Sequence, residues 1–351
     1  MKRFAFGLLA GCIGVFGTIA ASYGLLALAS PENMPAPPIT RLSALDEKLR
    51  YIRRNPELDP QILAIGSSIA WRQLDGAAFD AMAGRSGAFL NGGTVHLQMH
   101  QSREMLDFYL DHFSKVRSVL LLAGPPDFSD CSTAPAAMMP EDEAAAYAFR
   151  DWPAAYFYLR FFAPQRFIKA AANLPERQKP LLGDLWLDRW GSGPLHVPET
   201  MQRGLRYGPT GTDPACIDAL LGMAGDLRAR GVAFTLVFPP VHPAYREKYP
   251  AVMASLCGIA RRLEPAIADG SLRLLQYQDD PRYGEADFFD AFHLQFPAVQ
   301  RFSGEVAQAM GGPPPAEMLI ASSRRGVPDT GKALRPAVPA AAPPASQCGL
   351  T

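Results

Sequence analysis

The sequence predicts an α/β fold, a doubly wound, flavodoxin-like parallel sheet of about five strands with helices on both faces. Short apolar runs recur along the chain, and segments of helical length separate them. The runs show no polar alternation, which is typical of strands buried on both faces of a parallel sheet. The expected strands are 62–65, 88–90, 116–124, 232–238 and 272–277. The expected helices of this domain are 69–74, 97–113, 216–230, 249–268 and 296–310.

The first expected strand runs directly into Gly66, Ser67 and Ser68. These residues then lie at the carboxyl end of the strand, where open α/β sheets place their ligands. A serine there can be a nucleophile if a base is close. Far along the chain, Asp290 precedes His293 by three residues, so its carboxylate can orient the imidazole. We interpret Ser68, His293 and Asp290 as nucleophile, base and orienting acid of one site.

These two blocks together resemble the SGNH (GDSL-type) hydrolases, over residues 58–310. The third residue of the first block is the nucleophile in that family, which implies Ser68 rather than Ser67. The resemblance is to a membrane-anchored branch that includes alginate O-acetylation and lipoteichoic-acid D-alanylation proteins. It implies a serine esterase or O-acyltransferase. The substrates that it implies are O-acyl esters of a cell-surface polysaccharide, and we expect the acyl group to be acetyl. A membrane-bound O-acyltransferase is the partner that it implies.

The second block of the family carries an Asn and two glycines that help to bind an oxyanion. Asn91, Gly92 and Gly93 follow the second expected strand, and the family spacing Asn-x-Gly-x-x-Gly puts the last glycine at His96. We expect the backbone N–H of Ser68 as one donor. Either Gly92 or Gly93 supplies a second donor, or His96 does so through its backbone or ring. An exposed loop histidine with no such role is the alternative.

The third block of the family is Gly-x-Asn-Asp, and its Asn donates to the oxyanion. Here the block reads Gly124, Pro125, Pro126 and Asp127, and proline has no donor. Loss of one such donor costs roughly 10²- to 10³-fold in rate. Two rivals therefore stay open: a catalytically weakened partner or glycan-binding protein of a modification complex, and a plain lipase-like esterase. We expect Gly66, Ser67, Gly124 and Asp127 to line the site.

Residues 4–29 contain no charged side chain and follow Lys2 and Arg3. As a helix this segment is about 39 Å long, enough to cross a bilayer with some tilt. The preceding positive charges favour a cytoplasmic amino terminus, so residues 1–30 are expected to anchor the protein in the inner membrane, with the rest in the periplasm or outside. A cleaved signal peptide and a lipoprotein processed at Cys12 are the alternatives.

The expected organisation is an anchor (1–30), a Pro-rich linker (31–41), an α/β domain (42–310) with an aromatic-rich insertion (128–215), and a disordered tail (311–351). Residues 41–54 predict a solvated helix against the sheet edge. Residues 147–167 predict a helix whose aromatic side chains are mainly core; a lid, or a surface against a membrane or a sugar chain, is the alternative. Residues 188–194 predict a loop near the mouth of the site.

Lys and Arg number 34, as do Asp and Glu, so no basic field exists to recruit nucleic acid. Cys131 and Cys216 bracket the insertion and are expected to form a disulfide in an oxidising compartment, which would leave Cys257 free. No spacing predicts a metal site, and we expect no cofactor. His242 follows the fourth expected strand and is interpreted as structural or exposed rather than substrate-binding.

Overall fold

The computed structural model describes residues 2–29, 34–150, 152–183 and 185–311. The first part of the expected linker (31–33) and nearly all of the expected tail (312–351) lie outside these residues. The chain divides into two compact units. Unit 1 is drawn from Met1–Arg54 and Met139–Pro175, and unit 2 from Asn55–Met138 and Glu176–Thr351. The helix expected at 41–54 and part of the expected insertion thus belong to one unit, apart from the sheet.

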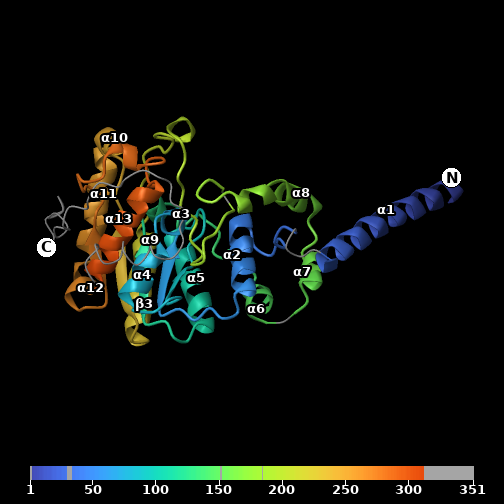
Figure 1. The fold of residues 1–351 in the computed structure, drawn as a ribbon, viewed down its shortest axis with the longest axis horizontal. Helices are drawn as coiled ribbons and strands as arrows, with labels where there is room; N and C mark the ends of the chain where they lie inside the picture. Colours follow the sequence, from blue (N-terminus) through green and yellow to red (C-terminus); the bar gives the residue numbers. More distant parts are fainter. Residues whose placement is uncertain (1, 30–33, 151, 184, 312–351) are drawn as a thin grey trace. The chain divides into compact units, whose positions relative to one another are not determined.

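Unit 2 contains a five-stranded, wholly parallel sheet in the order β2-β1-β3-β4-β5, which confirms the predicted α/β class (Figure 1). Strand β1 is central to the site because β2 and β3 flank it, with Ala64 paired to both Asn91 and Leu120. The strands are β1 (Ile62–Gly66), β2 (Phe89–Asn91), β3 (Ser118–Leu122), β4 (Ala233–Phe238) and β5 (Arg273–Gln276).

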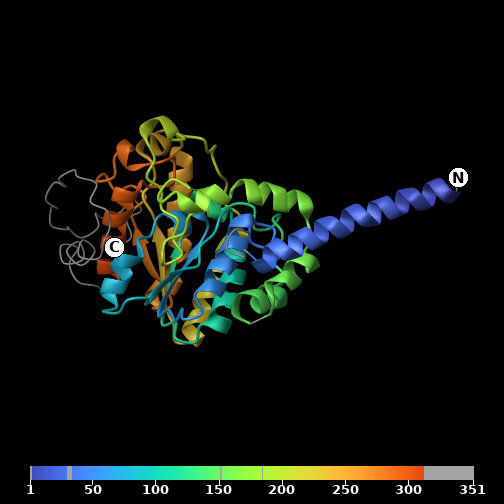
Figure 2. The same ribbon diagram turned by 45° about the vertical axis from the view of Figure 1, so that its right-hand side comes forward.

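Both faces of the sheet are covered, in agreement with the unbroken apolar runs. Ile62 and Ala64 pack in one core cluster with Phe79 and Phe302, whereas Leu63 points to the other face and is also fully buried. Helix α4 contacts α13, and α5 contacts α9. The helices around the sheet are α3 (Ser68–Arg72), α4 (Gly76–Met82), α5 (Met99–His112), α9 (Pro214–Ala229), α10 (Pro243–Lys248), α11 (Pro250–Arg262), α12 (Glu264–Ala268) and α13 (Phe296–Ala309) (Figure 2).

Prolines divide two segments that were expected as single helices. The segment 249–268 is split into α11 and α12, with Pro265 in the first turn of α12. The segment 147–167 is divided among α6 (Glu141–Phe149), α7 (Ala154–Arg160) and α8 (Pro164–Ala172). Pro153 caps α7 and Pro164 begins α8. A proline tolerates only the first turn of a helix, so each marks a new start.

The aromatic residues of α7 and of the segment just before it are only partly core, as the exposed fractions show. Phe157 and Tyr158 are buried, but Trp152 and Tyr156 are 47% and 40% exposed. Helix α8 has no buried residue, and its Ile168 is 68% exposed. The expectation that these aromatics are mainly core is therefore confirmed for Phe157 and Tyr158 and wrong for Trp152 and Tyr156.

Helix α2 (Ser43–Arg54) is not the solvated helix that was expected. Its Asp46 and Lys48 are 3% and 1% exposed. The Asp46 carboxylate accepts from the backbone N–H of Thr40 at 2.7 Å and from Arg166 at 3.2 Å. Burial raises the pKa of Asp46 to about 8 in spite of these partners. Charged residues on a strongly amphipathic helix were read as a solvated face, whereas here they are paired inside unit 1.

The first helix, α1 (Lys2–Ala29), is present, and it contacts α7 within unit 1. Its side chains at Phe4, Phe6 and Leu25 are 77%, 73% and 67% exposed. Among the residues that the structure describes, no helix was found to be long and apolar enough to cross a membrane. The expected anchor is therefore not confirmed.

The expected disulfide between Cys131 and Cys216 is present in unit 2, with a Cα–Cα distance of 5.3 Å. It joins the loop after β3 to the first turn of α9, 85 residues apart in the sequence. Cys257 is also disulfide-bonded, so the expectation of a free thiol there is wrong.

Candidate active site

Ser68 lies where β1 ends and α3 begins, and the local geometry requires glycine before it. Gly66 has a φ of +131°, and a Cβ there would lie 2.5 Å from the carbonyl oxygen of Leu122 on β3. Ser67 caps α3, since its hydroxyl accepts from the backbone N–H of Ile69 at 3.2 Å. Ser68 is therefore the first residue of the helix, and it is half-buried at the carboxyl edge of the sheet.

The structure brings the three expected catalytic residues together. The Oγ of Ser68 lies 3.0 Å from Nε2 of His293. The Nδ1 of the same ring lies 2.8 and 2.9 Å from the two carboxylate oxygens of Asp290. These distances meet the geometric requirement for a nucleophile, its base and an orienting acid. The residues are 225 positions apart at the widest, so only the fold places them side by side.

The Asp290 carboxylate is held firmly in the charged form. It is 4% exposed, and burial alone would raise its pKa. The facing His293 and the backbone N–H groups of Phe292 and His293, which donate to Oδ1 at 2.9 and 3.0 Å, outweigh burial and lower the pKa. A carboxylate that stays ionised can stabilise a proton on the imidazole.

Asp127 supports the nucleophile from the end of β3 instead of facing open space. Its Oδ2 accepts from the backbone N–H of Gly124 at 2.8 Å, and its carboxyl group is hydrogen-bonded to the side chain of Ser67. Burial raises the pKa of Asp127 to about 7. The link fixes the turn before Ser68 to the neighbouring strand.

Asn91, Gly92 and Gly93 have structural roles in the structure, contrary to the expectation of an oxyanion donor among the glycines. The N–H of Gly92 donates to the carbonyl of Ala64 at 2.8 Å, and that of Gly93 donates to the Asn91 side chain at 3.0 Å. The Asn91 Nδ2 donates to the carbonyl of Ala70 at 2.9 Å. These three residues tie β2 to β1 and α3, so both glycine amides are already in use.

His96 takes the backbone conformation that a glycine would favour. Its φ is +55°, in the left-handed region, at the position where the family spacing places a glycine. Its side chain is exposed. Within the part of the chain that the structure describes, the backbone N–H groups of Ser68 and His96 donate no hydrogen bond. Both amides are therefore free to donate to a ligand.

His242 has the structural role that was one of its two interpretations. Its backbone N–H donates to the carbonyl of Ala291 at 3.0 Å, and its Nδ1 accepts from the N–H of Ala244 at 3.2 Å to cap α10. Burial lowers the pKa of His242 and keeps the ring neutral, as a cap requires. His242 therefore ties the loop that carries Asp290 and His293 to the start of α10.

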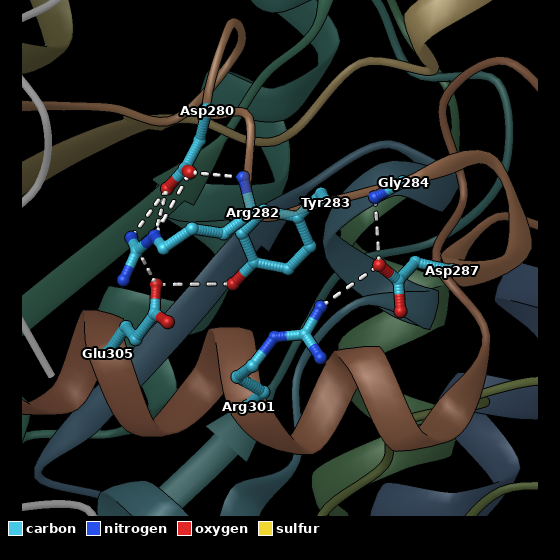
Figure 3. Close-up of polar contacts among 7 residues, drawn as sticks. All are labelled: Asp280, Arg282, Tyr283, Gly284, Asp287, Arg301 and Glu305. Atoms are coloured by element: carbon cyan, nitrogen blue, oxygen red, sulfur yellow. Dashed lines mark hydrogen bonds and ion pairs between the residues drawn. The ribbon is translucent and has the colours of Figure 1, made fainter. Parts of the chain in front are cut away.

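A polar network that the sequence did not reveal fixes the loop before Asp290 to α13 (Figure 3). Arg282 and the Tyr283 hydroxyl both donate to Glu305 on α13, at 3.0 and 3.2 Å. Arg301, also on α13, donates to Asp287 at 3.1 Å. These bonds hold residues 282–287 against α13, and the last of them lies three residues before Asp290.

Among the described residues, no group of His, Cys, Asp and Glu could hold a metal ion. The arrangement as a whole can accept a proton from a serine hydroxyl and stabilise the resulting imidazolium. No protein-family model matches the chain, and no curated protein matches it. The site therefore rests on its own geometry.

Proposed function

We propose that the protein is an SGNH-like serine esterase or O-acyltransferase that forms an acyl-enzyme at Ser68. The observation that carries the proposal is the chain of contacts from Ser68 through His293 to Asp290, at 3.0 and 2.8 Å, in a half-buried setting. A histidine with a purely structural role does not require both a carboxylate at one ring nitrogen and a serine hydroxyl at the other.

The chemistry follows from the positions of the atoms. Nε2 of His293 removes the Ser68 proton as Oγ attacks the carbonyl carbon of an ester, and the C=O electrons move to oxygen. The free amides of Ser68 and His96 are the available donors for that oxyanion. The imidazolium then protonates the leaving alcohol, and the C–O bond breaks to leave an acyl-serine. Attack by water or by a sugar hydroxyl, with the proton again taken by His293, releases the acyl group.

The substrate class that we propose is an O-acyl, chiefly acetyl, ester of a cell-surface polysaccharide. Its support is the resemblance to the membrane-anchored SGNH branch, together with a disulfide that suits an oxidising compartment. We further propose that α1 anchors the protein in the inner membrane, with the domain in the periplasm or outside. The apolar side chains that α1 exposes support an environment other than water. A membrane-bound O-acyltransferase is the partner in this scheme.

Transfer to a sugar is favoured over hydrolysis by the block that ends in Pro126 and Asp127. Proline supplies no donor at this position, and a missing oxyanion donor costs roughly 2.7–4 kcal/mol unless another group takes its place. A bound and well-placed hydroxyl gains up to about 7–11 kcal/mol from positioning, and bulk water does not. The same proline favours the second candidate function, a weakened SGNH-like partner or glycan-binding protein.

Labelling of the full-length chain with a fluorophosphonate probe separates the two candidates. Wild type should be labelled, Ser68→Ala should not, and Ser67→Ala should still be labelled, although loss of a helix cap lowers stability by about 1 kcal/mol. In cells, Ser68→Ala should abolish acyl transfer to the surface polymer at an unchanged protein level. Labelling of wild type that persists in Ser68→Ala, or a surface acyl content untouched by Ser68→Ala, would show that this serine is not the nucleophile. Brisk hydrolysis of p-nitrophenyl acetate would indicate an ordinary esterase.

A further inference from the structure

Residues 188–208, which we call the strap, connect the helix that carries Ser68 with the loop that carries His293. At its first end the strap is bonded to α3. The N–H of Gly193 donates to the carbonyl of Trp71 at 3.0 Å, and the Gly193 carbonyl accepts from Arg72 at 3.1 Å. The expected loop at 188–194 therefore lies against α3, where it contacts the third and fourth residues after Ser68.

The middle of the strap is bonded to the residues that follow His293. The N–H of Phe296 donates to the carbonyl of Leu195 at 2.7 Å. The Gln295 side chain accepts from the N–H of Val197 at 3.0 Å and donates to its carbonyl at 3.2 Å. These bonds fix the course of the strap at the start of α13.

The far end of the strap lies along the triad loop itself. The N–H of Arg203 donates to the carbonyl of Phe289 at 2.9 Å, and Gly204 forms a parallel bridge with Asp290. The ring of Tyr207 meets the ring of Phe292 edge-on, with the centroids 4.9 Å apart. Tyr207 therefore packs on the residue that precedes His293 in the sequence.

A second tyrosine also packs on the Phe292 ring. Tyr245 packs on it at 4.7 Å, and the Tyr245 hydroxyl donates to the carbonyl of Gly208 at 2.9 Å. Since the residue after Tyr207 is bonded in this way, both the ring and the backbone of Tyr207 have a defined position.

Charged groups around the nucleophile act on the Tyr207 phenol. Burial raises its pKa to about 12, and the carboxylates of Asp290 and Asp127 add to the rise. Arg203 and Arg72 act in the opposite direction. At neutral pH the phenol is therefore protonated and can donate. Its hydroxyl makes no hydrogen bond to any residue that the structure describes, and the side chain is half-buried.

These charged groups surround Ser68. Arg72 is one helical turn after it on α3, Asp127 is bonded to the residue before it, and Asp290 holds its base. Asp290, Asp127 and Arg72 all act on the Tyr207 phenol, so the phenol lies near the groups that hold Ser68 and its base.

We propose that Tyr207 is a catalytic residue of this site, whose phenolic O–H donates a hydrogen bond to the ester carbonyl oxygen as it becomes an oxyanion. The inference rests on the proposed function and replaces the donor that Pro126 cannot supply. The donor comes from a remote segment, so the family pattern around Pro126 does not reveal it.

The test is the rate of fluorophosphonate labelling of the full-length chain. Tyr207→Phe keeps the ring on Phe292 and removes only the hydroxyl, so the thermal unfolding midpoint should not change. The second-order rate constant should fall roughly 10²- to 10³-fold, mainly through the bond-forming step and not through probe binding. Tyr249→Phe, in the neighbouring aromatic pair, is the matched control and should label at the wild-type rate.

Three results would overturn the inference. One is a Tyr207→Phe rate within threefold of wild type while Ser68→Ala is unlabelled, which leaves the proposed function intact. Another is a loss confined to probe binding. The third is an equal loss in Tyr245→Phe, which loosens the strap but keeps the Tyr207 hydroxyl. If wild type itself is not labelled, the proposed function fails first.

Discussion

Replacement of Asp290 by Asn tests the electrostatic role of the site most directly, because the change is isosteric. Oδ1 accepts from the backbone N–H groups of Phe292 and His293, so the amide oxygen of the variant should occupy that position. Its NH₂ group then takes the position of Oδ2, which lies 2.9 Å from Nδ1 of His293. A donor there favours the tautomer with its proton on Nε2, which cannot accept the Ser68 proton.

The size of the effect follows from the distance. At 2.8 Å and an effective dielectric constant of about 20, the attraction between a carboxylate and an imidazolium is about 6 kcal/mol. Both groups are almost fully buried, so solvent screens this interaction little. Each 1.36 kcal/mol is a factor of ten, so we expect Asp290→Asn to lower the rate of acyl-enzyme formation by about 10⁴-fold.

Stopped-time fluorophosphonate labelling measures this rate, with Asp218→Asn as the control because Asp218 is an exposed carboxylate on α9. Circular dichroism should show an unchanged fold. A correctly folded Asp290→Asn protein that labels within tenfold of wild type would refute the reasoning, since neither the tautomer nor the charge would then matter.

Two further predictions concern stability. Burial raises the pKa of Asp127 to about 7, whereas the pKa in the unfolded chain is near 3.9. The resulting stabilisation of the folded state is therefore complete below the unfolded pKa and should be lost as pH rises toward 7, by about 4 kcal/mol in total. Urea unfolding across this window should show a flatter dependence of stability on pH for Asp127→Asn, and parallel profiles would contradict the assignment. The Cys131–Cys216 bond closes a loop of 85 residues, so replacing both cysteines by serine should lower the free energy of unfolding by up to about 4–5 kcal/mol. Non-reducing peptide mapping should recover the linked pair.

The parts of the fold that the sequence predicted are those where local and tertiary preferences agree. The strand before Gly66 is apolar at every position because both of its faces are covered. The strand ends at Gly66, a position whose backbone conformation and close contacts require glycine. The pairing of Ser68 with Asp290 and His293 was predictable for the same reason. Each of the two blocks lies in a loop at the carboxyl edge of a parallel sheet, where such loops meet.

The missed features depend on contacts between distant segments that carry no periodic signal. Tyr207 lies in an irregular segment, and nothing in its neighbours indicates that it packs against Phe292. The charge pattern of α2 gave a wrong prediction of a solvated helix, because an amphipathic helix with buried ion pairs has the same sequence pattern as one with a solvated polar face. The bonds that occupy the amides of Gly92 and Gly93 likewise become visible only in the folded structure, where the first donates to the Ala64 carbonyl and the second to the Asn91 side chain.

His96 shows how the second block can depart from the family pattern without losing its geometry. A φ of +55° costs a non-glycine residue about 1–2 kcal/mol, and such strain persists only where the surrounding structure imposes it. Here the amides on the amino-terminal side of the loop are fixed, since Gly92 and Thr94 donate to the carbonyls of Ala64 and Gly66 at 2.8 and 3.2 Å. At His96 the loop therefore has the left-handed backbone that a glycine would favour, and the His96 amide donates no hydrogen bond to a described residue. This backbone conformation, more than the identity of the residue, is what the proposed oxyanion role of the His96 amide requires.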